Sequence, residues 1–533
     1  MKSSFRSKIT FFSIAIFSGV IYMLSQPKFD LYFLSPFFYI PLHIYYRKTG
    51  NIWVYFAGGF FSFFFTVHWI THAITYYGGF PYIFAIVPLS LLSAVLGFFF
   101  LIFGYVREKL YSFSKLPYSI VDPIVWVSTE YIKTFLFTGF PWALVGYTFW
   151  KKDVLIQIAD IGGVYIISFF VLSISGFICD VYEKLRSSFT GQNKLSNQKL
   201  VFSGFFTLLL VCFVVVYGVY RRNQIEKIVE EQVSEIVSVV VQPAIPQDQK
   251  WTPEFKERYF RQNIDLTFSA LDYPYSNVLV VWPETGLTFY LEHEPKFKQE
   301  LLDLAKKGFY IISGGLGFSQ EGGRYRFYNR AFFITPEGEI FKYDKTHLVM
   351  FGEYIPLRGF LEKIPFIRKI IEEVEKVAGD FVPGEALNSM GEGDFRVGVP
   401  ICFESIFPQI SRHFVKDAAS IIAVITNDAW FGYSSGPFQH FSVSAIRAVE
   451  TRRFVLRSAN TGISGAFSPT GKVLKQTKLL ERTSFLVKIK PMHIQTFYTK
   501  YGDLFSVLCV VLGSVIYIFY LYANRRRNRN NMR

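Results

Sequence analysis

The chain contains little cysteine: four residues in 533, of which only Cys402 lies in the polar segment 234–490. That segment cannot form an internal disulfide, so we expect its lone thiol to be either buried or kept for chemistry. The sequence also lacks a Cys/His cluster with the spacing of a zinc site and a Gly-rich loop that could cradle a phosphate. We therefore expect neither a metal nor another cofactor.

Charged residues are scarce as well, at 18% of the chain, against 51% hydrophobic and 19% aromatic residues. This composition is too apolar for an ordinary soluble enzyme of this length and indicates a membrane protein. The net charge of +15 does not indicate a nucleic-acid partner, because the polar segment mixes both signs.

Long apolar runs divide the chain into a membrane domain at 1–222, a polar domain at 234–490, a last membrane helix at 504–522 and a basic cytoplasmic tail at 523–533. About seven spans are expected before the polar domain. The expected spans are Thr10–Leu24, Leu31–Tyr46, Ile52–Tyr76, Tyr82–Gly104, Ser119–Phe137, Val164–Ile178, Val201–Tyr220 and Leu504–Tyr522. The first could also be a signal peptide, but no clear cleavage site follows it, so we expect an uncleaved anchor.

Basic residues predict the orientation. They gather at the amino terminus, in alternate loops and in the tail: Lys2, Arg6, Lys8, Arg47, Lys48, Arg107, Lys109, Lys115, Lys184, Arg186, Lys194, Lys199, Arg525, Arg526, Arg527, Arg529 and Arg533. Because basic loops stay in the cytoplasm, both termini are expected there, and the polar domain on the other side of the membrane. Arg221 and Arg222, after the seventh span, count mildly against this pattern.

The polar domain alternates short β-branched runs with helical patterns, which predicts one α/β domain with sheets covered by helices. The expected strands are Ser238–Gln242, Asn277–Trp282, Tyr310–Gly314, Ala331–Thr335, Arg396–Ile401 and Ser420–Thr426, and the expected helices are Thr252–Ala270, Pro295–Lys307, Ile406–Lys416 and Phe438–Val455. Hairpin turns are expected at 335–338 and 468–471.

Reactive side chains lie at or near the ends of strand-like runs in this domain: Glu284, Lys345 and Cys402. Singly, a Cys is more often core filler, and a Glu or Lys a surface charge. Together they supply the parts of an acyl transfer: a carboxylate to take the thiol proton, a thiol to attack a carbonyl and an amine to stabilise the oxyanion.

The order of these three residues resembles the Glu-Lys-Cys triad of the nitrilase superfamily, and longer motifs resemble its membrane-bound branch, the apolipoprotein N-acyltransferase family. The motifs are Trp-Pro-Glu-Thr at 282–285, the run at 343–356 from Tyr343 to Pro356, Ile-Cys-Phe-Glu at 401–404, Asn-Asp-Ala-Trp-Phe-Gly at 427–432, Gly-Pro-Phe-Gln-His at 436–440, Arg-Ser-Ala-Asn-Thr-Gly-Ile-Ser at 457–464 and Gly-Phe-Pro-Trp at 139–142. The resemblance covers nearly the whole chain.

The resemblance implies a role for each matching residue and a nitrilase-like α-β-β-α sandwich outside the membrane. Glu284 is expected to be the general base, Lys345 the oxyanion stabiliser and Cys402 the nucleophile. Glu353 and Glu404 are expected to support them, and Trp251, Pro356 and Phe403 to bind substrate. Phe403 departs from the family, in which a tyrosine commonly follows the nucleophile. His347, His440, Asn427 and Asp428 are expected to shape loops around the site.

The resemblance also implies an activity: transfer of a fatty acyl chain from a phospholipid to the amino group of a diacylglyceryl-modified apolipoprotein, through a Cys402 thioester. We expect a monomer that works without a cofactor. Two alternatives remain open: a membrane-tethered amidase that passes its acyl group to water, and a non-catalytic transporter or scaffold. The triad does not distinguish transfer from hydrolysis, because both use the thioester.

Two further features leave alternatives open. The amphipathic stretch Ile355–Val377 fits either a mobile lid on the membrane surface or a helix packed on its own domain. Glu130 and Lys133 lie in one expected span, where charged groups are costly. For these two residues we expect structural pairing, or a position near the membrane interface, rather than a functional role.

Overall fold

The structure is a computed structural model that describes residues 2–190, 196–250, 252–321, 323–363, 368 and 380–531. The chain forms two compact units. The first comprises residues 1–71, 82–222 and 501–533, and the second comprises residues 72–81 and 223–500. We call them the membrane unit and the sandwich unit.

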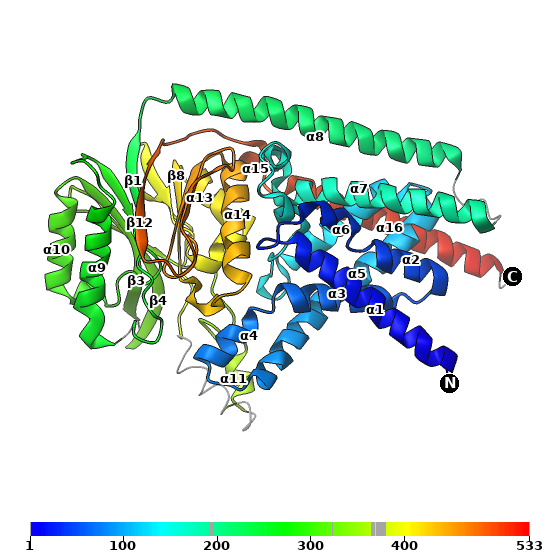
Figure 1. Cartoon of the computed structure of the whole chain (residues 1–533), viewed down its shortest axis with the longest axis horizontal. Coiled ribbons are helices and arrows are strands. Elements are labelled where there is room, and N and C mark those ends of the chain that lie inside the picture. The colour runs from blue at the N-terminus through cyan, green and yellow to red at the C-terminus, as the bar shows by residue number, and fades with distance from the viewer. Residues whose placement is uncertain are drawn as a thin grey trace. The chain divides into compact units, whose positions relative to one another are not determined.

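The membrane unit is helical (Figure 1). Its principal helices are α1 (Lys2–Ser25), α2 (Ile40–Thr49), α3 (Trp53–Thr66), α4 (Ile70–His72, whose last residue lies in the sandwich unit), α5 (Tyr82–Ser114), α6 (Tyr118–Lys133), α7 (Ala159–Thr190), α8 (Asn197–Glu231, which continues into the sandwich unit) and α16 (Leu504–Asn531). Within the described residues, five helices are long and apolar enough to cross a membrane, or six if a bent pair is one span. The expected number of crossings stays a prediction.

The bent pair lies where one continuous span, Ile52–Tyr76, was expected. The chain instead breaks after α3, and the helix that resumes at Ile70 and runs to Tyr77 is inclined to α3 by 57°. Helix α7 is also interrupted, at Gly162 and Gly163, and Gly163 has a φ of +65°. A left-handed residue of this kind suits glycine, which has no Cβ to clash.

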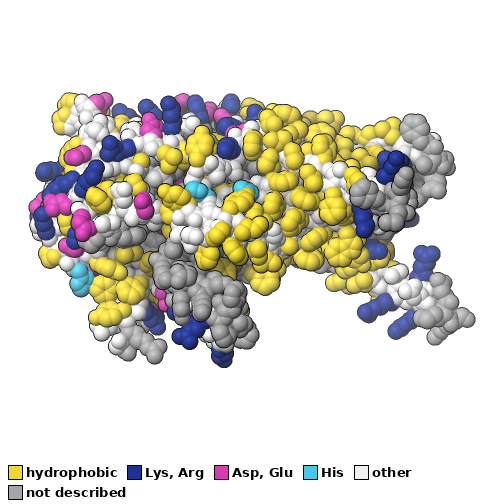
Figure 2. Space-filling view, turned by 60° about the horizontal axis from the view of Figure 1, so that its bottom comes forward, with side chains coloured by type: hydrophobic (Ala, Val, Ile, Leu, Met, Phe, Trp, Pro, Cys, Tyr) yellow, Lys and Arg dark blue, Asp and Glu magenta, His cyan; other side chains and the backbone are white. Residues whose placement is uncertain are grey.

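Hydrophobic side chains cover much of the surface of the membrane unit in the view of Figure 2. Exposed examples lie along α5, α8 and α16, among them Ile83, Leu91, Val201, Leu208, Ile518 and Phe519. An apolar surface of this extent suits hydrocarbon rather than water. The long helices of the membrane unit meet the requirement that backbone groups in lipid be hydrogen-bonded within the segment.

Arg107 is the centre of a buried ionic network in the membrane unit. Its guanidinium donates to both carboxylate oxygens of Asp122, each at 2.7 Å, and to Glu108 Oε1 at 2.8 Å. It also lies 2.9 Å from His43 Nδ1. Buried charged groups need partners, and here the partners come from α2, α5 and α6, so the network joins these helices.

The sandwich unit contains two six-stranded mixed sheets. The first has the order β12-β1-β2-β3-β4-β5 and the second the order β11-β10-β9-β8-β7-β6. The strands are β1 (Ile236–Gln242), β2 (Val278–Val281), β3 (Phe309–Glu321), β4 (Arg324–Ile334), β5 (Ile340–Asp344), β6 (Met390–Glu392), β7 (Phe395–Gly398), β8 (Ile421–Thr426), β9 (Phe454–Ala459), β10 (Gly465–Phe467), β11 (Val473–Gln476) and β12 (Thr483–Ile489).

Each sheet has three parallel strands in a row, β1-β2-β3 in the first and β7-β8-β9 in the second, with antiparallel strands outside them. The first and last strands of the unit pair, with Ile236 opposite Ile489. Helices α9 (Lys256–Ser269) and α10 (Pro295–Ala305) cover one sheet, and α13 (Pro408–Lys416) and α14 (Gly436–Thr451) cover the other (Figure 1). This confirms the expected α-β-β-α sandwich.

The core between α9, α10 and the first sheet shows why the β-branched runs became strands. Val239, Val241, Val278, Val280 and Ile311 are fully buried in one cluster with Trp282 and Phe297. All six expected strands and four expected helices are present, with shifted ends, and both expected turns close hairpins through the bonds Gly338 N to Thr335 O and Gly471 N to Ser468 O. The strands β5, β6 and β9 to β12 were not predicted.

Candidate active site

Three strands bring the predicted triad together. Glu284 follows β2, Lys345 directly follows β5, and Cys402 follows β7. All three side chains are buried, and Lys345 Nζ lies 3.9 Å from Glu284 Oε1. The pKa of the Cys402 thiol responds to the charges of both residues, so the thiol lies within electrostatic reach of the acid and the amine. A carboxylate, an ammonium and a thiol thus share one water-poor site.

The Glu284 carboxylate is fixed by two donors. Asn329 Nδ2, from β4, donates to its Oε1 at 2.7 Å, and the backbone N–H of Asn427, after β8, donates to its Oε2 at 2.8 Å. Glu284 is therefore held from both sheets. Neither donor occupies the whole carboxylate, and an oxygen that accepts one hydrogen bond retains a further lone pair.

Lys250 approaches the same residue from the loop after β1. Its Nζ donates to the backbone oxygen of Glu284 at 3.3 Å, and its side chain is almost completely buried. Burial lowers the pKa of Lys250 to about 7, although the negative charge of Glu284 opposes this. Besides Lys345, a second amine therefore lies beside Glu284, and this one, Lys250, can exchange a proton near neutral pH.

Lys345 is ion-paired to Glu353 as well as facing Glu284. Its Nζ donates to Glu353 Oε1 at 2.8 Å, and the same oxygen accepts from Asn329 Nδ2 at 2.8 Å. Burial alone acts to lower the pKa of Lys345, but the charges of Glu353 and then Glu284 outweigh it and raise the pKa above its ordinary value. The amine therefore stays an ammonium, which is the form that can stabilise a developing oxyanion.

Cys402 has an unusual backbone. It begins the 3-10 helix η8 (Cys402–Ile406) with a φ of +51°. A residue with a Cβ costs about 1 to 2 kcal/mol in this left-handed region, so the surroundings hold it there. Burial, and next the charge of Glu284, raises the pKa of the Cys402 thiol, while Lys345 lowers it less. The resting thiol is therefore protonated at neutral pH.

Glu404 joins the nucleophile's turn to the loop that carries Lys345. Its Oε2 accepts from the backbone N–H of Ile401 at 2.8 Å. Its Oε1 accepts from Tyr343 Oη, Thr346 N, Thr346 Oγ1 and His347 N, at 2.7 to 3.1 Å. Burial raises the pKa of Glu404, against which the Ile401 N–H acts in part. The carboxylate is completely enclosed by donors, so its place is structural.

The structure gives fewer contacts for the remaining predicted site residues. Phe403 is half-buried, with its ring 5.2 Å from that of Phe407, and Pro356 is half-buried in the loop after Glu353. Trp251 lies outside the described residues, as do 364–367 and 369–377 of the expected lid. Asn329 and Lys250 were missed, because neither belongs to a motif of acids, thiols or amines at a strand end.

Among the described residues, no group of three or more His, Cys, Asp or Glu side chains is arranged to hold a metal ion. The candidate site instead consists of one thiol, two carboxylates that face an ammonium, and their amide donors. This is an arrangement for proton transfer and covalent acyl chemistry.

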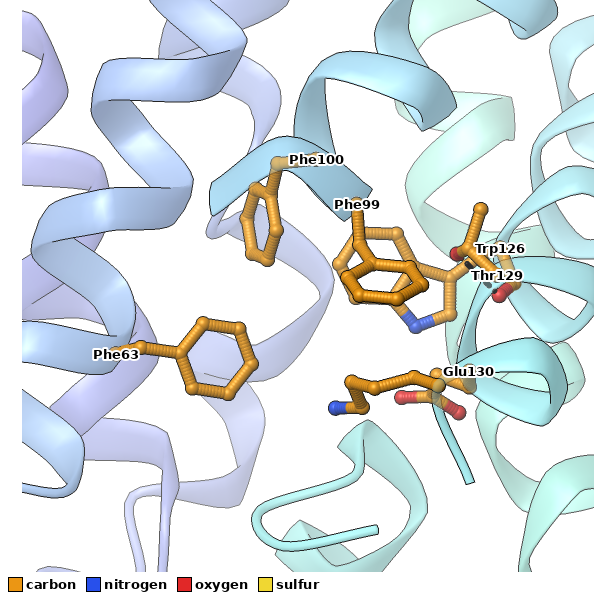
Figure 3. Close-up of a pocket in the computed structure, with 7 residues that line it drawn as sticks. Phe63, Phe99, Phe100, Trp126, Thr129 and Glu130 are labelled. Atoms are coloured by element: carbon orange, nitrogen blue, oxygen red, sulfur yellow. Dashed lines mark hydrogen bonds between the residues drawn. The ribbon is translucent and has the colours of Figure 1, made fainter. Parts of the chain in front are cut away.

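A cavity lies inside the membrane unit (Figure 3). Aromatic rings from α3, α5 and α6 line it, together with Glu130, Lys133 and Thr129. Glu130 Oε1 accepts from the backbone N–H of Val145 at 2.9 Å, and Lys133 Nζ lies 4.9 Å from the centre of the Phe63 ring. These contacts give both charged residues structural partners in the membrane unit.

Comparison with known families matches both parts of the chain. The apolipoprotein N-acyltransferase N-terminal domain matches residues 18–177, and the carbon-nitrogen hydrolase family matches residues 229–497. The second match contains Glu284, Lys345 and Cys402.

Individual relatives cover almost the full length. The apolipoprotein N-acyltransferase of Geobacter metallireducens is 32% identical over 512 residues, which cover 94% of each chain. That of Rickettsia prowazekii is 28% identical over 524 residues, covering 97% of this chain and 98% of the relative. Among solved structures, a carbon-nitrogen hydrolase from Helicobacter pylori is 16% identical with a TM-score of 0.36, covering 51% of this chain and 94% of its own.

Proposed function

The chain belongs to the apolipoprotein N-acyltransferase family, and on this premise we propose that it transfers a fatty acyl chain from a membrane phospholipid to the N-terminal amino group of an S-diacylglyceryl-cysteine apolipoprotein. The observation that carries the proposal is the buried group of Glu284, Lys345 and Cys402. The substrates in this proposal are those of the family, and the acyl chemistry is argued from the geometry of these three residues.

The first half-reaction acylates the enzyme. Glu284 takes the thiol proton of Cys402, and the sulfur attacks the ester carbonyl of the phospholipid. The Lys345 ammonium stabilises the oxyanion that forms. The carbon–oxygen bond then breaks, the leaving alkoxide takes the proton from Glu284, and a lysophospholipid departs from a Cys402 thioester.

The second half-reaction transfers the chain. The neutral α-amino group of the lipoprotein attacks the thioester carbonyl, again beside Lys345, and Glu284 accepts its proton. The carbon–sulfur bond breaks, and Glu284 returns the proton to the Cys402 thiolate as the amide product leaves. Because the acyl-enzyme separates the two substrates, the kinetics are ping-pong.

The multi-pass membrane unit suits these substrates, since both are lipids held in a bilayer. By the distribution of basic loops, the termini face the cytoplasm and the sandwich unit lies on the periplasmic side of the inner membrane. Anchoring the catalytic unit at that surface keeps the site within reach of lipid. The protein acts as a monomer and without a cofactor in this proposal.

Intact-protein mass spectrometry tests the proposal. The full chain in detergent is incubated with a phospholipid of one defined acyl chain, and then with a diacylglyceryl-cysteine peptide. We expect one acyl adduct on Cys402, which disappears as the peptide gains the same chain in amide linkage. Cys402→Ala removes the adduct, whereas Cys212→Ala, which removes the exposed thiol of α8, keeps it.

The other outcomes identify the alternatives. An adduct that decays equally fast without the peptide indicates hydrolysis, as in an amidase. If no adduct forms while the thiol is kept reduced, the acyltransferase proposal is wrong and the scaffold alternative gains support.

A further inference from the structure

The carbonyl of Cys402 is held from behind by side chains that the acyl-transfer steps do not use. Ser405 Oγ donates to Cys402 O at 2.8 Å, and His440 Nε2 lies 3.1 Å from the same oxygen. Cys402 has a left-handed backbone, which persists only where the surroundings determine it. These contacts hold the peptide group of Cys402, and the orientation of this group sets the direction of the thiol.

His440 connects this carbonyl to a buried carboxylate. Its Nε2 lies 2.9 Å from Ser405 Oγ, and its Nδ1 lies 2.9 Å from Asp428 Oδ1. Asp428 Oδ2 in turn accepts from Arg457 Nη2 at 2.8 Å, and its Oδ1 accepts from Thr426 Oγ1 at 2.9 Å. Ser405, His440 and Asp428 are all fully buried, and the hydrogen bonds described here run among them and to Cys402 O.

The charges of these groups follow from their surroundings. Although burial acts to raise it, Arg457 and His440 hold the pKa of Asp428 at about 2, so the carboxylate is ionised and can only accept. Arg457 Nη2, which can only donate, also lies 3.0 Å from His440 Nδ1. Burial, and next Arg457, lowers the pKa of His440, so the ring is neutral and carries one hydrogen. The ring lies between the Asp428 carboxylate and the Ser405 hydroxyl, which donates to the Cys402 carbonyl.

We propose that Asp428, His440 and Ser405 are positioning residues, a chain of hydrogen bonds that fixes the Cys402 carbonyl and so aims its thiol at Glu284 and Lys345. The proposal rests on the proposed function in that it takes Cys402 as the nucleophile. Ser405 is not a second nucleophile, because its hydroxyl is enclosed and already bonded to Cys402 O. These hydrogen bonds join η8 to α14 and to Asp428, the second residue after β8, so packing of these elements sets the direction of the thiol.

Alkylation of Cys402 by iodoacetamide, without any lipid, tests the positioning separately from acyl transfer. The rate is followed by mass spectrometry of the peptide that contains Cys402. In Ser405→Ala and His440→Gln we expect alkylation and thioester formation to slow by about 10- to 100-fold, with the KM for phospholipid unchanged. The double variant is expected to be no slower than the slower single variant, because the residues act as one chain.

The matched control is Ser442→Ala. Ser442 is also buried on α14, and its hydroxyl donates to a backbone oxygen, Gln439 O, at 2.7 Å. We expect its alkylation rate to equal that of the wild type. If Ser405→Ala does not fold, Asp428→Asn, which preserves the size of the side chain, replaces it. Wild-type alkylation rates in the folded variants, additive effects in the double variant, or an equal loss in Ser442→Ala would each overturn the positioning proposal.

Alkylation also separates the two proposals. If the wild type forms no thioester with phospholipid but the variants still slow alkylation, the proposed function fails and the positioning chain stands. If the thioester forms normally in Ser405→Ala and His440→Gln, the positioning chain fails and the proposed function stands.

Discussion

Lys345 Nζ lies 2.8 Å from Glu353 Oε1, in an ion pair whose side chains are 1% and 11% exposed. This pair, more than the approach of Glu284, keeps the amine charged, since Glu353 contributes the larger rise to the pKa of Lys345. Glu353 Oε2 also accepts from the backbone N–H of Val349 at 2.8 Å. Both carboxylate oxygens are therefore engaged by donors.

Glu353→Gln is expected to slow thioester formation by about 10- to 100-fold, equivalent to about 1.4 to 2.7 kcal/mol. The amide cannot accept at both ends, so its NH₂ group must face either Lys345 or the Val349 N–H. The measurement is the rate of adduct formation on Cys402. Glu392→Gln, at an exposed position ending β6, is the control. Equal rates in both variants would show that the ion pair does not act on Lys345 in catalysis.

Glu284→Gln is expected to have opposite effects on thiol ionisation and on catalysis. The Glu284 charge helps burial to raise the pKa of Cys402, so its removal lowers that pKa and moves the pH profile of alkylation toward acid. Acyl transfer should nevertheless fall by about 100- to 10,000-fold, because the general base is lost. Alkylation is measured between pH 6 and pH 10. A profile that stays in place, or moves toward alkali, would contradict the electrostatic coupling.

Glu404→Gln is expected to lower the stability of the sandwich unit by about 1 to 3 kcal/mol, the usual cost of an unsatisfied buried group. Glutamine has one acceptor oxygen for the donors on both sides of Glu404, so its NH₂ group faces either Ile401 N–H or the donors of the Lys345 loop. Thermal unfolding in detergent measures the loss. Glu385→Gln replaces an exposed carboxylate and should leave the unfolding temperature unchanged. An unaltered temperature in Glu404→Gln would count against a structural place for this residue.

Lys250 is expected to make stability depend on pH. Its folded pKa of about 7 lies below the unfolded value, so between about pH 7 and pH 10 the unfolded state binds more protons and stability rises with pH. The free-energy cost of burying the charged Lys250 amine is fully present below pH 7. Lys250→Met removes this contribution, so its unfolding temperature should rise less across that range. Lys472→Met, at an exposed position, should follow the wild type. If the unfolding temperatures of Lys250→Met and the wild type rose equally with pH, the lowered pKa of Lys250 would be refuted.

The sequence predicted Glu284 and Cys402 because each follows an apolar run that was expected to be a strand, and it predicted Lys345 through the motif at 343–356, since the strand before it, β5, was not expected. It did not predict Asn329, whose amide joins Glu284 to Glu353 only because β4 lies beside β3 and β5 in the first sheet. It did not predict Lys250 either, since a lysine gives no signal of burial until the fold surrounds it. These contacts depend on tertiary arrangement rather than local pattern.

The strands that were missed have physical reasons as well. Strand β9 contains Arg457, so its sequence does not look uniformly apolar, although all of its residues are buried. The burial of Arg457 is possible because it is paired with Asp428. Strand β5 is short and mostly half-buried, so its pattern is weak. The break after α3 has neither proline nor glycine at Val67, His68 and Trp69. An apolar run of sufficient length therefore predicted one straight span where the chain bends.

The pairing of β1 with β12 has a consequence for synthesis of the protein. Strand β1 is made first, but its neighbour on one side, β12, leaves the ribosome only after all the other strands. At the usual 5 to 20 residues per second, this delay lasts roughly ten to fifty seconds. Throughout that time β1 has an open edge of the kind that attracts wrong partners. Chaperones that shield such edges are therefore expected to matter more for this protein than for one whose first strand pairs with its sequence neighbours alone.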